Sequence, residues 1–238
     1  MTWTLADPDR AVRLAIYRGF AGQGRPPSVA ELAAQAGLAE TAVRAAMRHL
    51  HEAHAIVLTP AGDAVRIAHP FSAAPMGFVV SAEGRGPAGY AGDRMWWGGC
   101  AWDSFGIGAA LGEPVVIRTR CPGCGRDLTV RAGPAQPPEP DLVVRIPCPA
   151  SRWWDDVIST CANIRLFCEG SHVGSWQQED ARAALRPDGR VISAVTMWRL
   201  AQSWYGDRLD PDWSPRTTAA AQCLLTQVGL TGGFWQLP

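Results

Sequence analysis

The sequence predicts an α+β protein in which an N-terminal winged-helix-like helical module packs on a mixed α/β core with small β-sheets. Three observations predict this class. Apolar residues recur at helical spacing early in the chain, a hairpin signal follows them, and short strand-like runs alternate with helix-like runs afterwards. A length of 238 residues suits one large domain or two small ones. We place the N-terminal module in residues 1–80, and a second domain with a C-terminal extension in residues 81–238.

Three helices are predicted in the N-terminal module. Apolar side chains repeat at helical spacing in residues 10–22. A second helix is expected after Ser28, because Ser28 and Glu31 have the spacing of a capping box. Gly37 interrupts the pattern, and residues 40–53 form the third predicted helix.

A hairpin is predicted next, in the segment IVLTPAGDAVRIA, which has strand character on both sides of Pro-Ala-Gly-Asp. Three helices followed by a hairpin is the winged-helix arrangement. Residues 1–80 carry seven arginines and six acidic residues, and a net charge of +1 is a weak footprint for a duplex binder. Arg44, Arg48 and His51 could read bases from one helix face or form an ordinary solvated face. Winged helices also pack against proteins, so we do not expect nucleic acid as a partner.

The second half of the chain changes character. Strands are predicted in PVVIRTR, RDLTVRAG and DLVVRIP, and a helix in VISAVTMWRLAQSWYG. The segment STCANIRLFC has a strand interpretation that places Cys161 and Cys168 on opposite faces. The C-terminal tail could cap a pocket or dock a partner. In it, we interpret Arg208 and the neighbouring aspartates as a salt-linked turn, and Cys223 as a core residue.

Composition narrows the function classes. The chain has 22 basic and 22 acidic residues, and a zero net charge argues against a protein that mainly holds nucleic acid or an anionic membrane. No run approaches the ~18 apolar residues of a membrane span, and the first residues do not resemble a signal peptide. We therefore expect a cytoplasmic protein with no membrane partner. Its seven cysteines would stay reduced there, as free, metal-binding or catalytic thiols.

The stretch GGCAWD places a thiol and a carboxylate three residues apart. The Gly98–Gly99 pair can precede a helix start, where the helix dipole lowers the pKa of a thiol such as Cys100. Positions i and i+3 share a helix face, so Cys100 and Asp103 would address the same space. Without a second thiol, the same residues would be a small core residue and a helix cap. The aromatic residues expected to wall a dry pocket here are Trp97, Trp102 and Phe105.

Cys161 is the candidate second thiol. Two thiols beside one carboxylate would combine soft ligands for a soft metal with a proton donor. The carboxylate is ill suited as a ligand for a soft metal, but it can act as an acid there.

Three motifs occur in the order seen in organomercurial lyases (alkylmercury lyases): CAWD at 100–103, CPGCGRDLTV at 121–130 and STCANIRLF at 159–167. The chain resembles this family over roughly residues 10–180. The resemblance implies an enzyme of mercury resistance and detoxification, which cleaves a carbon–mercury bond by protonolysis into a hydrocarbon and Hg(II). By position, Cys100 and Cys161 match the catalytic thiols that hold mercury, and Asp103 matches the acid that handles the proton.

The same resemblance implies that no organic cofactor is required and that Hg(II) stays bound as the product. The implied partners are an organomercury substrate and a thiol carrier or mercuric reductase that accepts the Hg(II). The resemblance also matches Cys121 to a further family cysteine that is regarded as structural.

Cys124 departs from the family pattern. It creates Cys-Pro-Gly-Cys, which on its own resembles half of a zinc ribbon, although Cys148 and Cys168 do not form the second pair that a full ribbon needs. A structural zinc could take three ligands from Cys121, Cys124 and Cys148, and a fourth from Cys168 or His172. This motif also keeps open a rival function, a thiol-based metal sensor or winged-helix regulator without catalysis.

Overall fold

The computed structural model describes residues 5–83, 94–179 and 189–238. The three predicted N-terminal helices are present as α1 (Asp7–Gln23), α2 (Val29–Ala36) and α3 (Glu40–Glu52). The Ser28–Glu31 capping box is confirmed, since the Ser28 hydroxyl accepts from the Glu31 amide and the Glu31 carboxylate accepts from the Ser28 amide. Helix α2 ends at Gly37, whose left-handed φ of 65° suits glycine.

A seven-stranded antiparallel sheet follows, in the order β1-β2-β3-β5-β4-β6-β7. Its strands are β1 (Val57–Leu58), β2 (Val65–Ala68), β3 (Phe71–Ser72), β4 (Phe78–Ala82), β5 (Met95–Gly98), β6 (Val115–Arg120) and β7 (Asp127–Ala132). The predicted hairpin is confirmed as β1–β2, and β3 joins it to the central strands. The expected boundary between residues 80 and 81 falls inside β4, so one sheet runs across it. The winged-helix assignment and the division into two domains stay predictions.

A second, three-stranded sheet has the order β10-β8-β9. It contains β8 (Val143–Ile146), β9 (Arg165–Phe167) and β10 (Arg190–Ser193). The strand interpretation around Cys161 is wrong, because Cys161 lies in helix α5 (Val157–Asn163). The Asp156 carboxylate accepts a hydrogen bond from the Ser159 amide and caps this helix, a local signal that outweighs the strand pattern. The chain becomes extended only at Arg165.

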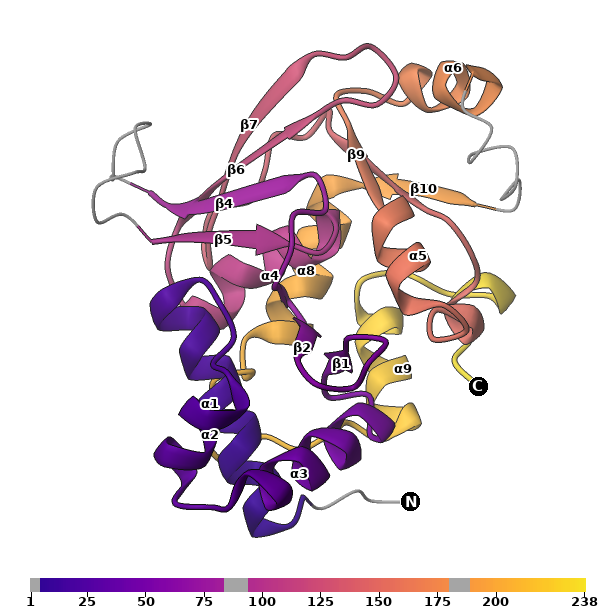
Figure 1. Ribbon diagram of the computed structural model, residues 1–238. Helices are drawn as coiled ribbons and strands as arrows, with labels where there is room; N and C mark the ends of the chain where they lie inside the picture. The colour runs from indigo at the N-terminus through magenta and orange to yellow at the C-terminus, as the bar shows by residue number, and fades with distance from the viewer. Residues whose placement is uncertain (1–4, 84–93, 180–188) are drawn as a thin grey trace.

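In Figure 1, two helices lie beneath strands β4–β7 of the large sheet, namely α4 (Ala101–Leu111) and α8 (Ala194–Tyr205). Helix α4 packs against β4, β5 and β6 on one side and against α8 on the other. Gly106 permits this close approach, since a Cβ there would overlap the ring of Tyr205. The remaining helices within the described residues are α6 (Ser171–Glu179), α9 (Thr218–Gln227) and the short 3₁₀ helices η1 (Ala150–Arg152) and η2 (Gly233–Trp235).

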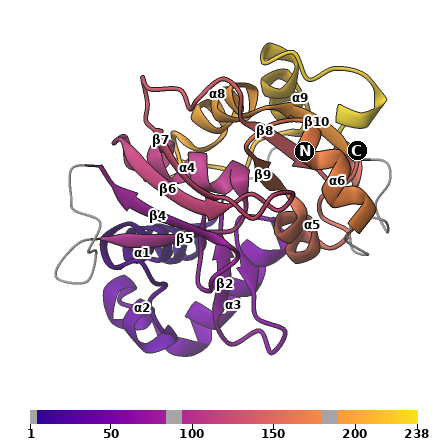
Figure 2. The ribbon, with the colours of Figure 1, turned by 90° about the horizontal axis from the view of Figure 1, so that it is seen from above.

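Buried contacts connect the N-terminal helices to the rest of the chain. The Trp96 indole on β5 donates to the Phe20 carbonyl of α1 at 2.9 Å. The buried Arg13 guanidinium on α1 donates to the Arg208 carbonyl, also at 2.9 Å. Helices α1–α3 form one end of the molecule in Figure 1. Seen from above, α2 and α9 lie on opposite sides of the molecule (Figure 2).

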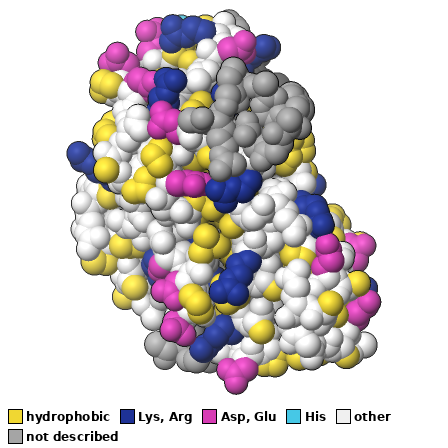
Figure 3. Space-filling view, turned by 90° about the vertical axis from the view of Figure 1, so that its left-hand side faces the viewer, with side chains coloured by type: hydrophobic (Ala, Val, Ile, Leu, Met, Phe, Trp, Pro, Cys, Tyr) yellow, Lys and Arg dark blue, Asp and Glu magenta, His cyan; other side chains and the backbone are white. Residues whose placement is uncertain are grey.

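Basic and acidic side chains are interspersed over the face shown in Figure 3, without a large patch of either sign. Within the described ranges, no helix is both long enough and apolar enough to cross a membrane.

Candidate active site

Cys100 and Asp103 lie at the first turn of α4. Cys100 is the N-cap residue, and its sulfur accepts a hydrogen bond from the Asp103 amide at 3.3 Å. The helix start predicted from GGCAWD is therefore confirmed. Gly99 is required here, because a Cβ would overlap the Asp103 carboxylate.

The Asp103 carboxylate has no solvent exposure and is surrounded by donors. The Tyr205 hydroxyl donates to Oδ1 at 2.7 Å, and His69 Nδ1 lies 3.1 Å from both carboxylate oxygens. The Cys161 thiol donates to Oδ2 at 4.0 Å. A buried carboxylate is costly unless it is hydrogen-bonded, and these three side chains meet that requirement.

Cys161 reaches Asp103 because the end of α5 is held against the start of α4. The Ala101 amide donates to the Ile164 carbonyl at 3.1 Å, so this one backbone contact connects the segments that carry the two thiols. Cys161 also lies within side-chain hydrogen-bonding reach of Cys100, which raises the pKa of the Cys100 thiol. The structure thus brings together Cys100, Asp103 and Cys161, the three predicted residues.

The ionisation of the site differs from what the helix start alone predicts. Burial raises the pKa of the Cys100 thiol well above its usual value, and the neighbouring Cys161 and Asp103 raise it further. The expected lowering by the helix dipole is outweighed, because desolvation penalises a buried thiolate. Burial lowers the pKa of His69, but Asp103 and Cys161 act more strongly in the opposite direction, and the result is about 9. His69 is therefore an imidazolium at neutral pH.

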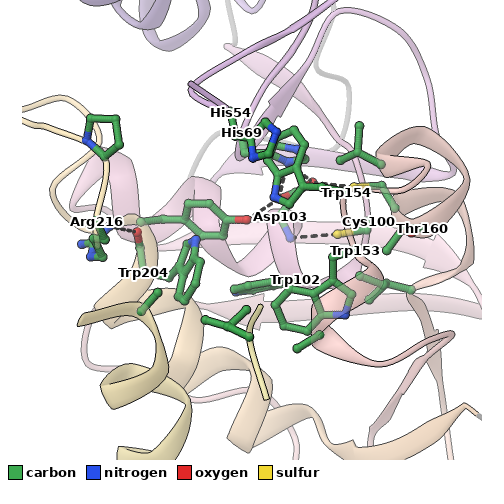
Figure 4. A pocket seen from close by; sticks show the side chains of 18 of the residues that line it. His54, His69, Cys100, Trp102, Asp103, Trp153, Trp154, Thr160, Trp204 and Arg216 are labelled. Atoms are coloured by element: carbon green, nitrogen blue, oxygen red, sulfur yellow. Dashed lines mark hydrogen bonds and ion pairs between the residues drawn. The ribbon is translucent and has the colours of Figure 1, made fainter. Parts of the chain in front are cut away.

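The site opens into a pocket of about 310 Å³. Figure 4 shows His69, Cys100 and Asp103 meeting in this pocket among indole rings. The tryptophans that line it are Trp102, Trp153, Trp154, Trp204 and Trp213. The Trp102 ring meets Trp153 and Trp204 edge-on, at centroid distances of 5.2 and 5.1 Å. These rings give the pocket a mainly apolar wall.

Of the three aromatic residues expected to wall the pocket, only Trp102 does so. Trp96 on β5 faces α1, and its neighbour Trp97 points to the other face of the strand, away from the pocket. Phe105 lies two positions after Asp103 on α4, and residues at this spacing face different sides of a helix.

The C-terminal tail lines the pocket, as one of its two predicted roles requires. Its lining residues are Arg208, Trp213, Pro215, Arg216, Thr218, Ala221, Leu237 and Pro238. Arg208 is buried and stacks on Trp213, with its guanidinium carbon 4.5 Å from the ring centroid. It does not form the expected salt-linked turn, since Asp207 pairs with Arg216 and Asp212 lies 3.8 Å from Arg10.

Sequence reasoning missed His69 and Tyr205. His69 lies between two short strands and belongs to none of the motifs considered. Tyr205 is the last residue of α8, where an aromatic side chain on an apolar face indicates only core packing. Both residues are far from CAWD in the sequence, so no local pattern indicated that either one contacts Asp103.

A second group of potential ligands lies elsewhere. Ligand atoms of Cys121, Cys124, Cys168 and His172 all lie within 4.8 Å of one another. Cys148, the expected third zinc ligand, is outside this group, because its sulfur faces the Thr160 hydroxyl at 3.8 Å. Cys223 is exposed on α9, so its assignment to the core is wrong.

Two thiols and one buried carboxylate at the end of an apolar pocket suit a thiol-dependent protein that handles a soft metal, the class to which organomercurial lyases belong. A sequence model of one such family, MerB, described as alkylmercury lyase, matches residues 71–206. This match covers more than half of the chain, so the chain belongs to the alkylmercury lyase family, and it is a carbon–mercury lyase.

The fold agrees with this family. A crystal structure of the mercury-bound form of MerB2 is similar, with a TM-score of 0.61 at 20% identity. The similarity covers 87% of this chain and 92% of the other. No curated protein matches the chain in sequence.

Proposed function

We propose that this organomercurial lyase holds mercury between Cys100 and Cys161, and that Asp103 transfers the proton that cleaves the carbon–mercury bond. One observation carries this assignment: the two thiols meet the same buried residue. The amide of Asp103 donates to the Cys100 sulfur, and its carboxylate accepts from the Cys161 thiol.

Capture starts with exchange at a thiol. A substrate R–Hg–SR′ reacts with Cys100, the new sulfur–mercury bond replaces the old one, and the Cys100 proton leaves with R′SH. This order suits a Cys100 thiol whose pKa is raised, because the departing thiolate takes up the proton. The tryptophan-lined pocket accepts the apolar organic group.

The second thiol, Cys161, then adds to mercury as a thiolate and brings a negative charge. The Cys161 proton moves to Asp103 Oδ2, which it already faces, and the Cys161 sulfur adds to mercury. The complex now carries one negative charge, which the His69 imidazolium stabilises at close range in a buried site. Tyr205 keeps its proton, because burial and Asp103 raise its pKa well above the usual value, and it holds the carboxylate in place.

The bond breaks when Asp103 returns the proton to carbon. The electron pair of the carbon–mercury bond forms the new C–H bond, the hydrocarbon leaves, and Hg(II) stays on the two sulfurs. General acid catalysis by a placed carboxyl group explains why the site pairs soft ligands with a buried acid. A thiol carrier or a mercuric reductase then accepts Hg(II) by further thiol exchange.

The direct test supplies methylmercury or phenylmercury with excess thiol and measures methane or benzene together with bound mercury. We expect hydrocarbon release in a single turnover, with one Hg(II) kept per chain until a competing dithiol is added. Binding of organomercury without any hydrocarbon would contradict the proposal and favour a metal sensor.

A further inference from the structure

A group of three cysteines and one histidine lies outside the candidate active site, where two parts of the fold meet. Cys121 and Cys124 belong to the turn between β6 and β7 of the large sheet. Cys168 directly follows β9 of the small sheet, and His172 lies in the first turn of α6. Figure 1 shows this end of the β6–β7 hairpin next to α6, at the edge of the molecule remote from α1–α3.

The distances suit a tetrahedral metal ion. With Zn–S bonds of about 2.3 Å, two sulfurs on a tetrahedral zinc lie roughly 3.8 Å apart. The Cys168 sulfur lies 3.5 Å from that of Cys121 and 3.6 Å from that of Cys124. His172 Nδ1 lies 2.9 Å from the Cys168 sulfur and 4.0 Å from the Cys121 sulfur, on either side of the spacing expected for a nitrogen ligand.

The surroundings orient the ligands as in known metal sites. The other ring nitrogen of His172, Nε2, lies 3.4 Å from a Glu169 carboxylate oxygen. A carboxylate at this position selects the tautomer whose Nδ1 is free to bind metal. Gly123 allows the two segments to meet, because a Cβ there would lie 2.7 Å from the His172 Cβ and would also overlap its carbonyl oxygen. The glycine of Cys-Pro-Gly-Cys thus serves this contact.

We propose that Cys121, Cys124, Cys168 and His172 bind one structural zinc ion. Four protein ligands leave no open position, which distinguishes a structural site from a catalytic one, and three thiolates favour a soft or borderline metal over Mg²⁺ or Ca²⁺. The ion connects the β6–β7 turn to the junction of β9 and α6. Strand β9 directly follows α5, the helix that carries Cys161. The zinc ion therefore also fixes the position of α5.

The metal content of an untagged protein, purified without chelators, tests this proposal. We expect one zinc per chain by elemental mass spectrometry, and a background level in Cys124→Ser and Cys168→Ser. Cys223→Ser is the matched control, since this exposed cysteine lies outside the group, and it should keep its zinc. The double variant Cys100→Ala/Cys161→Ala should also keep one zinc, which separates this site from the candidate active site.

Cobalt substitution of the unaltered chain gives a result even if the variants fold poorly. Co(II) in this site should show the intense visible bands of a tetrahedral ion and the near-ultraviolet bands of thiolate charge transfer. Three outcomes would overturn the proposal: no bound metal, zinc lost with the active-site cysteines, or a disulfide that peptide mapping locates within the group.

Discussion

Tyr205 donates a 2.7 Å hydrogen bond to Asp103 Oδ1, although the two residues are 102 positions apart in the sequence. The same carboxylate presents its other oxygen, Oδ2, to the Cys161 thiol. Each oxygen therefore has its own partner, and the hydroxyl fixes the orientation in which the second oxygen faces the sulfur. Gly106, one turn after Asp103, leaves the space that the Tyr205 ring occupies.

Tyr205→Phe should slow the proton transfer and leave capture intact. A hydrogen bond to a charged group contributes about 1.5–3 kcal/mol, so the rate of hydrocarbon release should fall by roughly 10- to 100-fold. Rapid mixing with one equivalent of phenylmercury measures capture, by loss of free thiol, and benzene release separately. A parallel loss of capture and release would show that Tyr205 only supports the fold.

The His69–Asp103 pair predicts a pH-dependent stability. The pKa of His69 rises from 6.5 to about 9 on folding. The folded state thus holds the imidazole proton more tightly than the unfolded chain. The stabilisation is fully present below pH 6.5 and is lost as the pH rises through 9, with a total on the order of 3 kcal/mol. Urea unfolding between pH 6 and pH 9.5 should show this decline.

His69→Gln should flatten the decline in that window. His49→Gln is the matched control, because His49 pairs with Asp9 at 3.4 Å but is 60% exposed, and an exposed ion pair contributes little to stability. The buried Cys100 thiol also makes stability fall with pH, but only above its ordinary pKa of 9.0, so its contribution begins where that of His69 ends. An unchanged slope in His69→Gln would contradict the assignment of a charged His69.

Features that depend on residues close together in the sequence could be predicted. The Ser28 capping box, the Pro-Ala-Gly-Asp hairpin and the helix start at Cys100 each depend on residues a few positions apart, and each is confirmed. The helix at Cys161 was missed because its decisive signal, the Asp156 cap, lies outside the short strand-like motif.

The residues that surround the site could not be predicted from local sequence patterns. His69 and Tyr205 reach Asp103 only through the packing of the sheet and of α8, which no spacing in the sequence reports. The same packing buries Cys100 and reverses the direction in which its pKa shifts. The sequence could therefore supply the candidate reacting groups, whereas their charge states depend on the tertiary structure.

Cys161→Ala should lose both stable capture and turnover. With one sulfur left, mercury cannot gain its second thiolate, and Asp103 loses the thiol that supplies its proton. Mercury retention after gel filtration in the presence of a competing monothiol should fall from one equivalent to near zero. Cys223→Ser is the control, because its exposed thiol lies far along the chain in α9 and should leave retention at the active site unchanged.

Asp103→Asn separates binding from chemistry most sharply. Asparagine keeps the size and the backbone amide that contacts Cys100, but it cannot deliver an acid proton. The variant should still hold one equivalent of organomercury, and its hydrocarbon release should fall by about 10²–10⁴-fold or more, the usual contribution of general acid catalysis. Folding and mercury content must be measured in the same sample, because the amide also replaces an acceptor of the His69 and Tyr205 hydrogen bonds. Release near the parent rate would show that the carboxylate is only part of the helix start, and the proton would have to come from another group.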